Sequence, residues 1–168
     1  MIVTVPGLLE AADSLASLHA ARGLRVAVVP QQDVFDAFSS GVADPTAVKM
    51  LMMMLTDRAA QSDGAIQPPR YLTLMGDASY ENRNVQGNGT TIVGHYSSES
   101  LQTTTSYISD DYFALVAEGQ SEKPEELLQL GVGRIPASDL ASAMAVVGKV
   151  ATYSGVDEGA IDAASCLD

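Results

Sequence analysis

The sequence predicts an α/β protein built on a mostly parallel sheet. Short apolar runs rich in β-branched residues alternate with longer segments in which apolar residues recur every three or four positions. The first thirty residues hold a run, a helical segment and a second run, which is the order of a parallel βαβ unit. Proline or glycine ends most of these segments and so marks their boundaries.

The first unit consists of a strand, a helix and a strand, expected at residues 2–5, 8–22 and 24–29. Pro6 and Pro30 end the two strands. Gly23 follows the helix at the position where a left-handed residue is favoured.

Two further helices are expected at residues 31–38 and 45–60. Asp44 can cap the second one, and Pro45 suits its first turn because a first-turn amide has no intrahelical partner. Met50 and residues 52–54 crowd this helix with methionine on more than one face. Adaptable core filling explains that composition, and packing on two sides or against a partner is the alternative.

A buried central strand is expected at residues 71–75, where an apolar run follows two prolines. Gly76 and Asp77 end the run. The carboxyl ends of strands in an open parallel sheet face the ligand crevice, so Asp77 is a candidate residue of a functional edge. The structural alternative is that Gly76 permits a tight turn and Asp77 caps the next element.

Residues 82–105 are rich in glycine, asparagine, serine and threonine and predict a long loop. Loops of that length inside a compact domain are usually functional or mobile. His95 lies in this segment, and no serine or cysteine stands near it at the spacing of a catalytic pair.

Two adjacent carboxylates, Asp110 and Asp111, precede a short strand predicted at residues 113–116. Side chains alternate between faces on an extended chain, so one carboxylate can enter a buried network while the other stays in water. Together with Asp77 they could offer oxygen ligands to a hard cation such as Ca²⁺. Alternatively, they pair with Arg134 or cap backbone amides.

The last predicted strand covers residues 127–136, and a helix follows it. Gly131 and Gly133 indicate a backbone that passes close to a neighbour. They do not form a dinucleotide-binding fingerprint, because the third glycine is missing and a proline precedes the helix. Ser138 is expected to cap that helix, which ends near Tyr153.

Nine basic and twenty-one acidic residues give a formal net charge of −12, which argues against nucleic acid as a partner. No apolar run approaches the roughly 20 residues of a membrane span. The first residues also lack the basic head and long apolar middle of a signal peptide. The single cysteine, Cys166, cannot form an internal disulfide. It lies two residues before the end of the sequence, where the backbone is a poorly fixed support for a catalytic nucleophile.

Three segments in order resemble the gingipain-like cysteine peptidases. They are YLTLMGDASY at 71–80, TSYISDDYF at 105–113 and LGVGRIP at 130–136. Within that family the likeness is greatest to the cell-surface sortase subunit of the type IX secretion system. The resemblance covers about residues 1–154 and implies the first subdomain of a three-layer, caspase-like fold with helices on both faces of the sheet. Residues 155–168 are then a linker or the start of a second subdomain.

In that family the catalytic histidine and cysteine belong to the second subdomain, and none of His19, His95 and Cys166 matches their motifs. The resemblance therefore implies a non-catalytic N-terminal subdomain of a cysteine endopeptidase or sortase that processes or anchors secreted proteins. The implied partners are the C-terminal catalytic subdomain, a protein or peptide substrate and secretion-system subunits. The implied location is the bacterial cell surface, after export.

Four residues are expected to border the cleft or hold its edge without a catalytic role: Asp77, Asp110, Asp111 and Arg134. No cofactor is expected, with a structural Ca²⁺ at the carboxylates as the alternative. The alternative function is an acidic α/β module that binds a cation or scaffolds an assembly and has no peptidase role.

Overall fold

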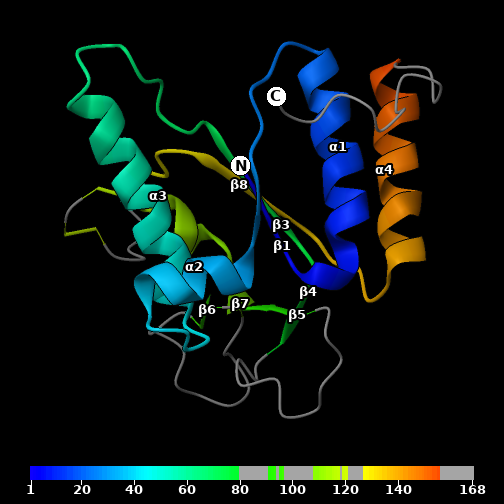
Figure 1. Ribbon diagram of the computed structural model, residues 1–168, viewed down its shortest axis with the longest axis horizontal. Coiled ribbons are helices and arrows are strands. Elements are labelled where there is room, and N and C mark those ends of the chain that lie inside the picture. The colour runs from blue at the N-terminus through cyan, green and yellow to red at the C-terminus, as the bar shows by residue number, and fades with distance from the viewer. Residues whose placement is uncertain (80–90, 94, 97–107, 118, 121–126, 156–168) are drawn as a thin grey trace.

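The computed structural model describes residues 1–79, 91–93, 95–96, 108–117, 119–120 and 127–155. Its main sheet has four parallel strands in the order β2-β1-β3-β8 (Figure 1). The strands are β1 (Ile2–Thr4), β2 (Val28–Pro30), β3 (Tyr71–Met75) and β8 (Gly131–Ile135). The predicted α/β class with a mostly parallel sheet is confirmed, and β3 is an inner strand as predicted.

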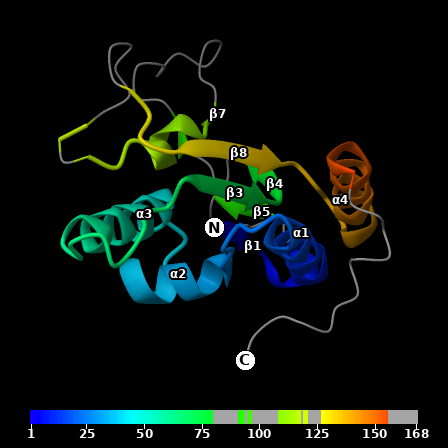
Figure 2. The same ribbon diagram turned by 90° about the horizontal axis from the view of Figure 1, so that it is seen from above.

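One pair of helices covers each face of the sheet (Figures 1 and 2). The pairs are α1 (Leu9–Ala21) with α4 (Leu140–Ser154), and α2 (Gln31–Phe38) with α3 (Pro45–Ala60). β2 lies beside β1 in the sheet, and β3 lies on the opposite side of β1, so the connection from β2 to β3 runs in the opposite direction to that from β1 to β2. Crossovers of a single hand then require helices on opposite faces. The strand order reverses between β1 and β3, the place where open α/β sheets bind ligands.

The core lies on both faces of the two inner strands. The residues of β1 are at most 2% exposed, and Leu72, Leu74 and Met75 of β3 are equally buried. The hydroxyl of Thr4 is buried too, and it donates to the carbonyl oxygen of Met75 at 3.1 Å. This hydrogen bond satisfies the buried hydroxyl.

The helix ends confirm two predicted signals and correct a third. Asp44 caps α3, because its Oδ1 accepts from the Thr46 amide at 2.8 Å, and Pro45 is the first helical residue. The predicted cap of α4 at Ser138 is wrong. Asp139 caps this helix instead, since its carboxylate accepts from the Ser142 amide at 2.8 Å and the Ser142 hydroxyl accepts from the Asp139 amide.

Two predicted strands begin too early. β2 pairs only with the three residues of β1, so 24–27 has no partner to extend along, and Leu24 is exposed. β8 begins at Gly131 because its partner β3 begins opposite it, at Tyr71. Residues 127–130 therefore lie outside the sheet.

The strand predicted at residues 113–116 is wrong. A 3-10 helix, η2 (Asp111–Ala114), stands at its start, because the amide of Phe113 donates to the carbonyl of Asp110 at 3.1 Å and closes a turn. Phe113 is fully buried by this turn, so its apolar character reflects packing and not an extended backbone.

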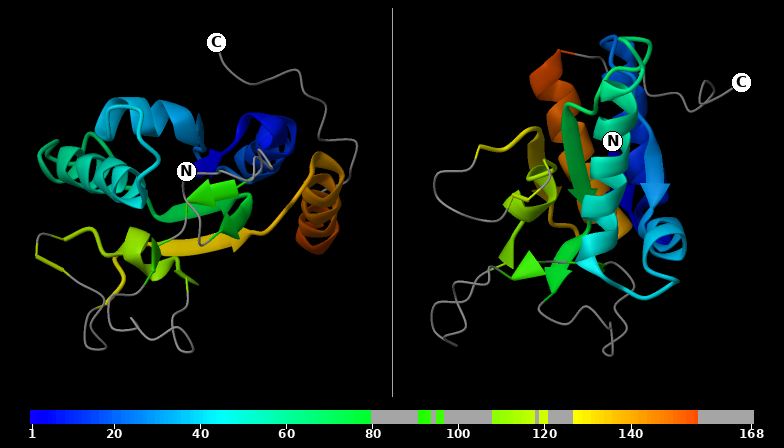
Figure 3. Two further views of the ribbon diagram at one scale, coloured as in Figure 1. Left: turned by 90° about the horizontal axis from the view of Figure 1, so that it is seen from below. Right: turned by 90° about the vertical axis from the view of Figure 1, so that its left-hand side faces the viewer.

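Part of the loop predicted at residues 82–105 is also strand, and the rest lies outside the described residues. β4 (Asp77–Ser79) pairs in parallel with β5 (Thr91–Val93), and β6 (His95–Tyr96) pairs antiparallel with β7 (Ile108–Ser109). These short pairs lie beyond the carboxyl ends of the main strands, with β4 continuing the path of β3 (Figure 3, right).

A short 3-10 helix, η1 (Pro6–Leu8), joins β1 to α1. No helix in the described ranges is both long enough and apolar enough to cross a membrane.

Candidate functional site

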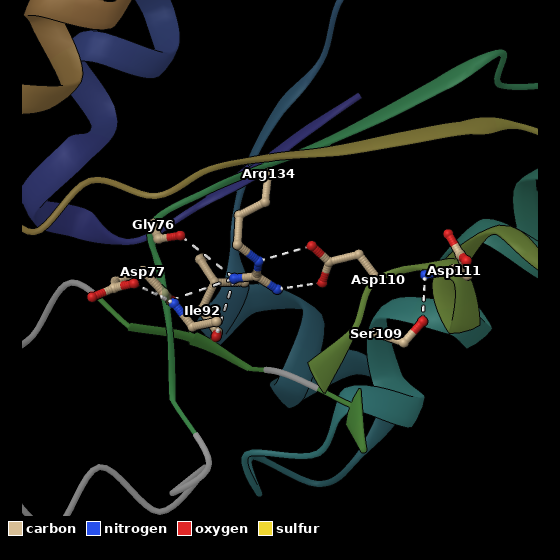
Figure 4. Close-up of polar contacts among 8 residues, drawn as sticks. Gly76, Asp77, Ile92, Ser109, Asp110, Asp111 and Arg134 are labelled. Atoms are coloured by element: carbon tan, nitrogen blue, oxygen red, sulfur yellow. Dashed lines mark hydrogen bonds and ion pairs between the residues drawn. The ribbon is translucent and has the colours of Figure 1, made fainter. Parts of the chain in front are cut away.

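The guanidinium of Arg134 is the centre of the polar contacts at the carboxyl edge of the sheet (Figure 4). Arg134 lies on β8, and its side chain is 11% exposed. Its Nε and Nη2 donate to the two carboxylate oxygens of Asp110 at 2.9 and 2.7 Å. This two-point geometry is the strongest form of a side-chain ion pair.

The third nitrogen of the same guanidinium faces three backbone carbonyls. Nη1 lies 3.4 Å from the carbonyl oxygens of Gly76, Asp77 and Ile92, which are long contacts. These carbonyls belong to the end of β3, to β4 and to β5. A single side chain therefore links β8, the β3–β4 junction, β5 and the residue before η2.

The backbone around Asp110 frees its carboxylate for this pair. Asp110 precedes η2 at the position where an aspartate often caps a helix, but its side chain accepts no capping hydrogen bond. Its carboxylate is 22% exposed and turns to Arg134 instead. Removing two opposite charges from water together costs less than burying either one alone.

Asp77 and Asp111 contribute differently from Asp110. The carboxylate of Asp77 accepts from the next amide, that of Ala78, at 2.8 Å, and only its carbonyl faces Arg134. Asp111 is exposed, and its amide donates to the Ser109 hydroxyl at 3.3 Å. Figure 4 shows both of these carboxylates directed away from the guanidinium.

The structure thus gathers only part of the predicted residue set. Asp110 and Arg134 pair directly, and Asp77 joins them through its backbone. Within the ranges that the structure describes, no group of three or more His, Cys, Asp or Glu residues could hold a metal ion. Asp77, Asp110 and Asp111 do not converge on one point in the described residues, and the Arg134 guanidinium pairs with Asp110 where the cation was expected.

Three contributions were not predicted from the sequence: two backbone carbonyls, a hydrogen bond of Gln31 and a contact between Lys49 and Tyr112. The carbonyls of Gly76 and Ile92 are backbone groups, which no residue type reveals, although the β-branched run at 91–93 could have indicated the strand that holds Ile92. Gln31 also ties this strand to α2, because its side-chain amide donates to the carbonyl of Thr91 at 2.8 Å.

Lys49 and Tyr112 form the third unpredicted contact. Lys49 of α3 is 9% exposed, and its Nζ lies 4.4 Å from the centre of the Tyr112 ring in η2. The Tyr112 hydroxyl also lies 3.4 Å from the hydroxyl of Thr46. These contacts fasten η2 to α3, so the segment that carries Asp110 is held from two sides.

Of the two histidines and the single cysteine, the structure describes only the side chain of His19, which lies away from this edge. His19 lies near the end of α1, which runs back toward the amino ends of the strands. Its Nδ1 is buried without a hydrogen-bond partner, and burial, followed by the charges of Arg22 and the amino terminus, lowers the pKa of its imidazole. The His95 side chain and Cys166 lie outside what the structure describes. In the described residues, the contacts at this edge are the Asp110–Arg134 ion pair and hydrogen bonds to backbone groups, which link separate segments of the chain.

Comparison with known proteins identifies the family. The family model described as peptidase family C25 matches residues 1–165. The crystal structure of dimeric latent PorU from Porphyromonas gingivalis is similar with a TM-score of 0.72 and 29% sequence identity. That match covers 90% of this chain and 15% of the PorU chain, so the sequence spans a small part of PorU's length. No curated protein sequence matches this chain.

The family match spans nearly the whole chain, and the PorU likeness agrees with it in both sequence and fold. The resemblance read from the three motifs is therefore confirmed, and the chain belongs to peptidase family C25, the gingipain family.

Proposed function

We propose that this chain is the non-catalytic N-terminal subdomain of a gingipain-like cysteine endopeptidase or sortase. One observation carries the proposal: the peptidase family match runs over residues 1–165 while the same chain corresponds to 15% of PorU. A segment of that size supplies a supporting part of a larger peptidase. The proposed unit ends at about Ser154, where α4 ends.

The Arg134 network suits a supporting role. It fixes the end of β3, β5 and the segment before η2 relative to one another at the carboxyl edge of the sheet. Ligands of open α/β sheets bind at this edge. We assign Asp110 and Arg134 to holding the edge of a substrate cleft, and Asp77 and Asp111 to bordering it.

The partners follow from the family. The catalytic histidine and cysteine come from a second, caspase-like subdomain that packs against this one, and the substrate is a protein or peptide. The likeness to PorU, the type IX sortase, favours processing or anchoring of secreted proteins at the bacterial cell surface, in contact with other secretion-system subunits.

The test compares the 168-residue chain with the full-length parent protein. The purified chain, assayed on fluorogenic peptides and on a denatured protein, is expected to show no cleavage that a thiol-alkylating reagent can block. The parent protein is expected to show such cleavage. The Cys166→Ser variant of the parent is the matched control and should keep full activity.

Cleavage by the chain alone that disappears in its Cys166→Ser variant would contradict the proposal, because it would place the nucleophile in this segment. In the parent, Arg134→Met is expected to lower activity while the catalytic cysteine still reacts with the alkylating reagent. Loss of both would point to unfolding, which circular dichroism would detect.

A further inference from the structure

A cavity of about 390 Å³ lies along α3, near the end of α2. Its lining includes Phe38, Met50, Met53, Met54, Asp57 and Arg58. Gln61 is the seventh lining residue, and three of the seven carry a thioether sulfur. The Arg134 network has no part in this cavity, so the inference drawn from it is independent of the proposed function.

The three methionines share one face of the helix. Met53 and Met54 follow Met50 by three and four positions, a spacing that puts Cβ atoms about 5–6 Å apart. The methionine side chain is unbranched and has three rotatable bonds, so three sulfurs at this spacing can approach a common point. Such convergence needs no movement of the backbone.

Core packing accounts for these positions only in part, because Met53 and Met54 pack against the core and line the cavity as well. Met52 of the same helix is completely buried and fills the core, whereas Met50 is 44% exposed and Met53 and Met54 are only partly buried. Four of the seven methionines of the chain, Met50 and those at 52–54, fall within five residues. The helix therefore presents three thioethers to an open cavity in addition to the one that packs inside.

Thioether sulfur is a soft and uncharged ligand. It binds Cu(I) and related soft cations, whereas Ca²⁺ and Mg²⁺ require oxygen ligands. The Asp57 carboxylate in the lining and the net charge of −12 attract a cation, and the Arg58 guanidinium opposes it locally.

We propose that Met50, Met53 and Met54 form a binding site for a soft monovalent metal ion, Cu(I) or its analogue Ag(I). The ion enters and leaves in the same oxidation state, so the step needs neither an oxidant nor a reductant. Phe38 lines the cavity with an apolar ring that has no atom able to bind the metal ion.

The test titrates the full 168-residue chain with Ag(I) nitrate and, under anaerobic conditions, with Cu(I). The Cys166→Ser background is used because a thiolate would compete for the ion. One ion is expected to bind per chain. Replacing all three methionines by leucine keeps the volume and the apolar character of the cavity, and binding should weaken by about tenfold or more once the ligands are gone.

Met144→Leu is the matched control, because Met144 is the only methionine of α4 and is partly buried. The Met144→Leu variant should bind the ion with the same affinity as the chain in which all methionines are kept. A second readout needs no substitution: in carbon-13 spectra of the methionine methyl groups, the signals of Met50, Met53 and Met54 should shift with Ag(I). Those of Met75 and Met144 should stay in place.

Two results would overturn the proposal. Unchanged affinity in the triple leucine variant would assign the ion to other donors, such as the histidines. No binding by the parent chain, together with self-association that the triple variant alters, would make the cavity a docking surface for a second copy.

Discussion

Asp110 and Arg134 stand 24 residues apart in the sequence and meet through two hydrogen bonds of 2.9 and 2.7 Å. Both side chains are mostly shielded from water. Among the described contacts at the carboxyl edge, we therefore expect loss of this pair to lower the stability of the protein most.

Arg134→Met is expected to lower the free energy of unfolding by about 2–4 kcal/mol, because it leaves the Asp110 carboxylate poorly hydrated and unpaired. Urea denaturation at pH 7 measures the change. Asp111→Asn is the matched control, and a change within about 0.5 kcal/mol is expected because Asp111 is exposed. An Arg134→Met variant as stable as the parent chain would show that the pair contributes nothing net.

Lys49 and Tyr112 should be energetically coupled. The ammonium lies 4.4 Å from the ring centre and is largely removed from water, so the coupling should be about 0.5–2 kcal/mol. A double-mutant cycle with Lys49→Met and Tyr112→Leu measures it. If the two losses are simply additive, the cation and the ring do not interact, and other contacts, such as that between Tyr112 and Thr46, hold η2 against α3.

Asp139 should stabilise the protein in a pH-dependent way. The backbone hydrogen bond from Ser142, above all, lowers the pKa of this carboxyl group. A folded-state pKa below the unfolded one gives stability that is present above the unfolded value, near 4, and is lost as pH falls through the folded value. Asp139→Ala should therefore be less stable than the parent chain at pH 7, and the difference should shrink below pH 4.

Asp139→Asn is the control for this prediction. Asparagine also caps helices but has no charge to lose, so its stability relative to Asp139→Ala should stay constant between pH 7 and pH 3. Urea denaturation at both pH values decides. A parent chain that differs from Asp139→Ala by the same amount at both pH values would exclude titration of the cap.

Gly131 and Gly133 lie two residues apart on β8 but have different surroundings. A Cβ atom at Gly131 would stand 2.9 Å from the Tyr71 ring, whereas a Cβ atom at Gly133 would meet nothing within 4 Å. Gly133→Ala should raise the free energy of unfolding by about 0.4–1 kcal/mol, because it restricts the unfolded chain.

Gly131→Ala should be less stable than Gly133→Ala, since the exposed Tyr71 ring must swing aside. In a Tyr71→Ala background the two variants should become equal. A difference that survives removal of the ring would mean that the backbone of β8, and not this contact, makes Gly131 necessary.

These two glycines also show how far the sequence could be interpreted. Their presence predicted a close neighbour for the backbone, and the structure provides one at Gly131 but not at Gly133. Periodicity and breakers predicted the parallel sheet and the helices well, because these signals arise within each segment. Strand length depended on the partner: β2 stops where β1 offers nothing more to pair with.

Only those parts of the candidate site that consist of charged side chains could be predicted from the sequence. Asp110, Asp111 and Arg134 stood out as charged residues between apolar runs, and pairing with Arg134 was among the alternatives. Which carboxylate pairs with Arg134 depended on the turn that starts η2 and on the packing of Phe113, and neither can be derived from the residue types alone. The carbonyls of Gly76 and Ile92 depend on the end of β3 and on β5, and their residue types carry no information about them.

Arg134 lies on β8, an edge strand and the last in sequence of the four strands of the main sheet, and this position suggests an order of events during folding. The strands β2, β1 and β3 pair without β8, so the inner sheet can form while later residues are still being added to the chain. Gly76 and Asp77, whose carbonyls contact the guanidinium, precede Arg134 by 58 and 57 residues in the sequence. Distant contacts of this kind form late, because a long loop must close first. We therefore expect the carboxyl edge to be the last part of the sheet to become rigid. A chain that ends before β8 lacks both Arg134 and the part of the core that α4 supplies, including Ala143 and Val147.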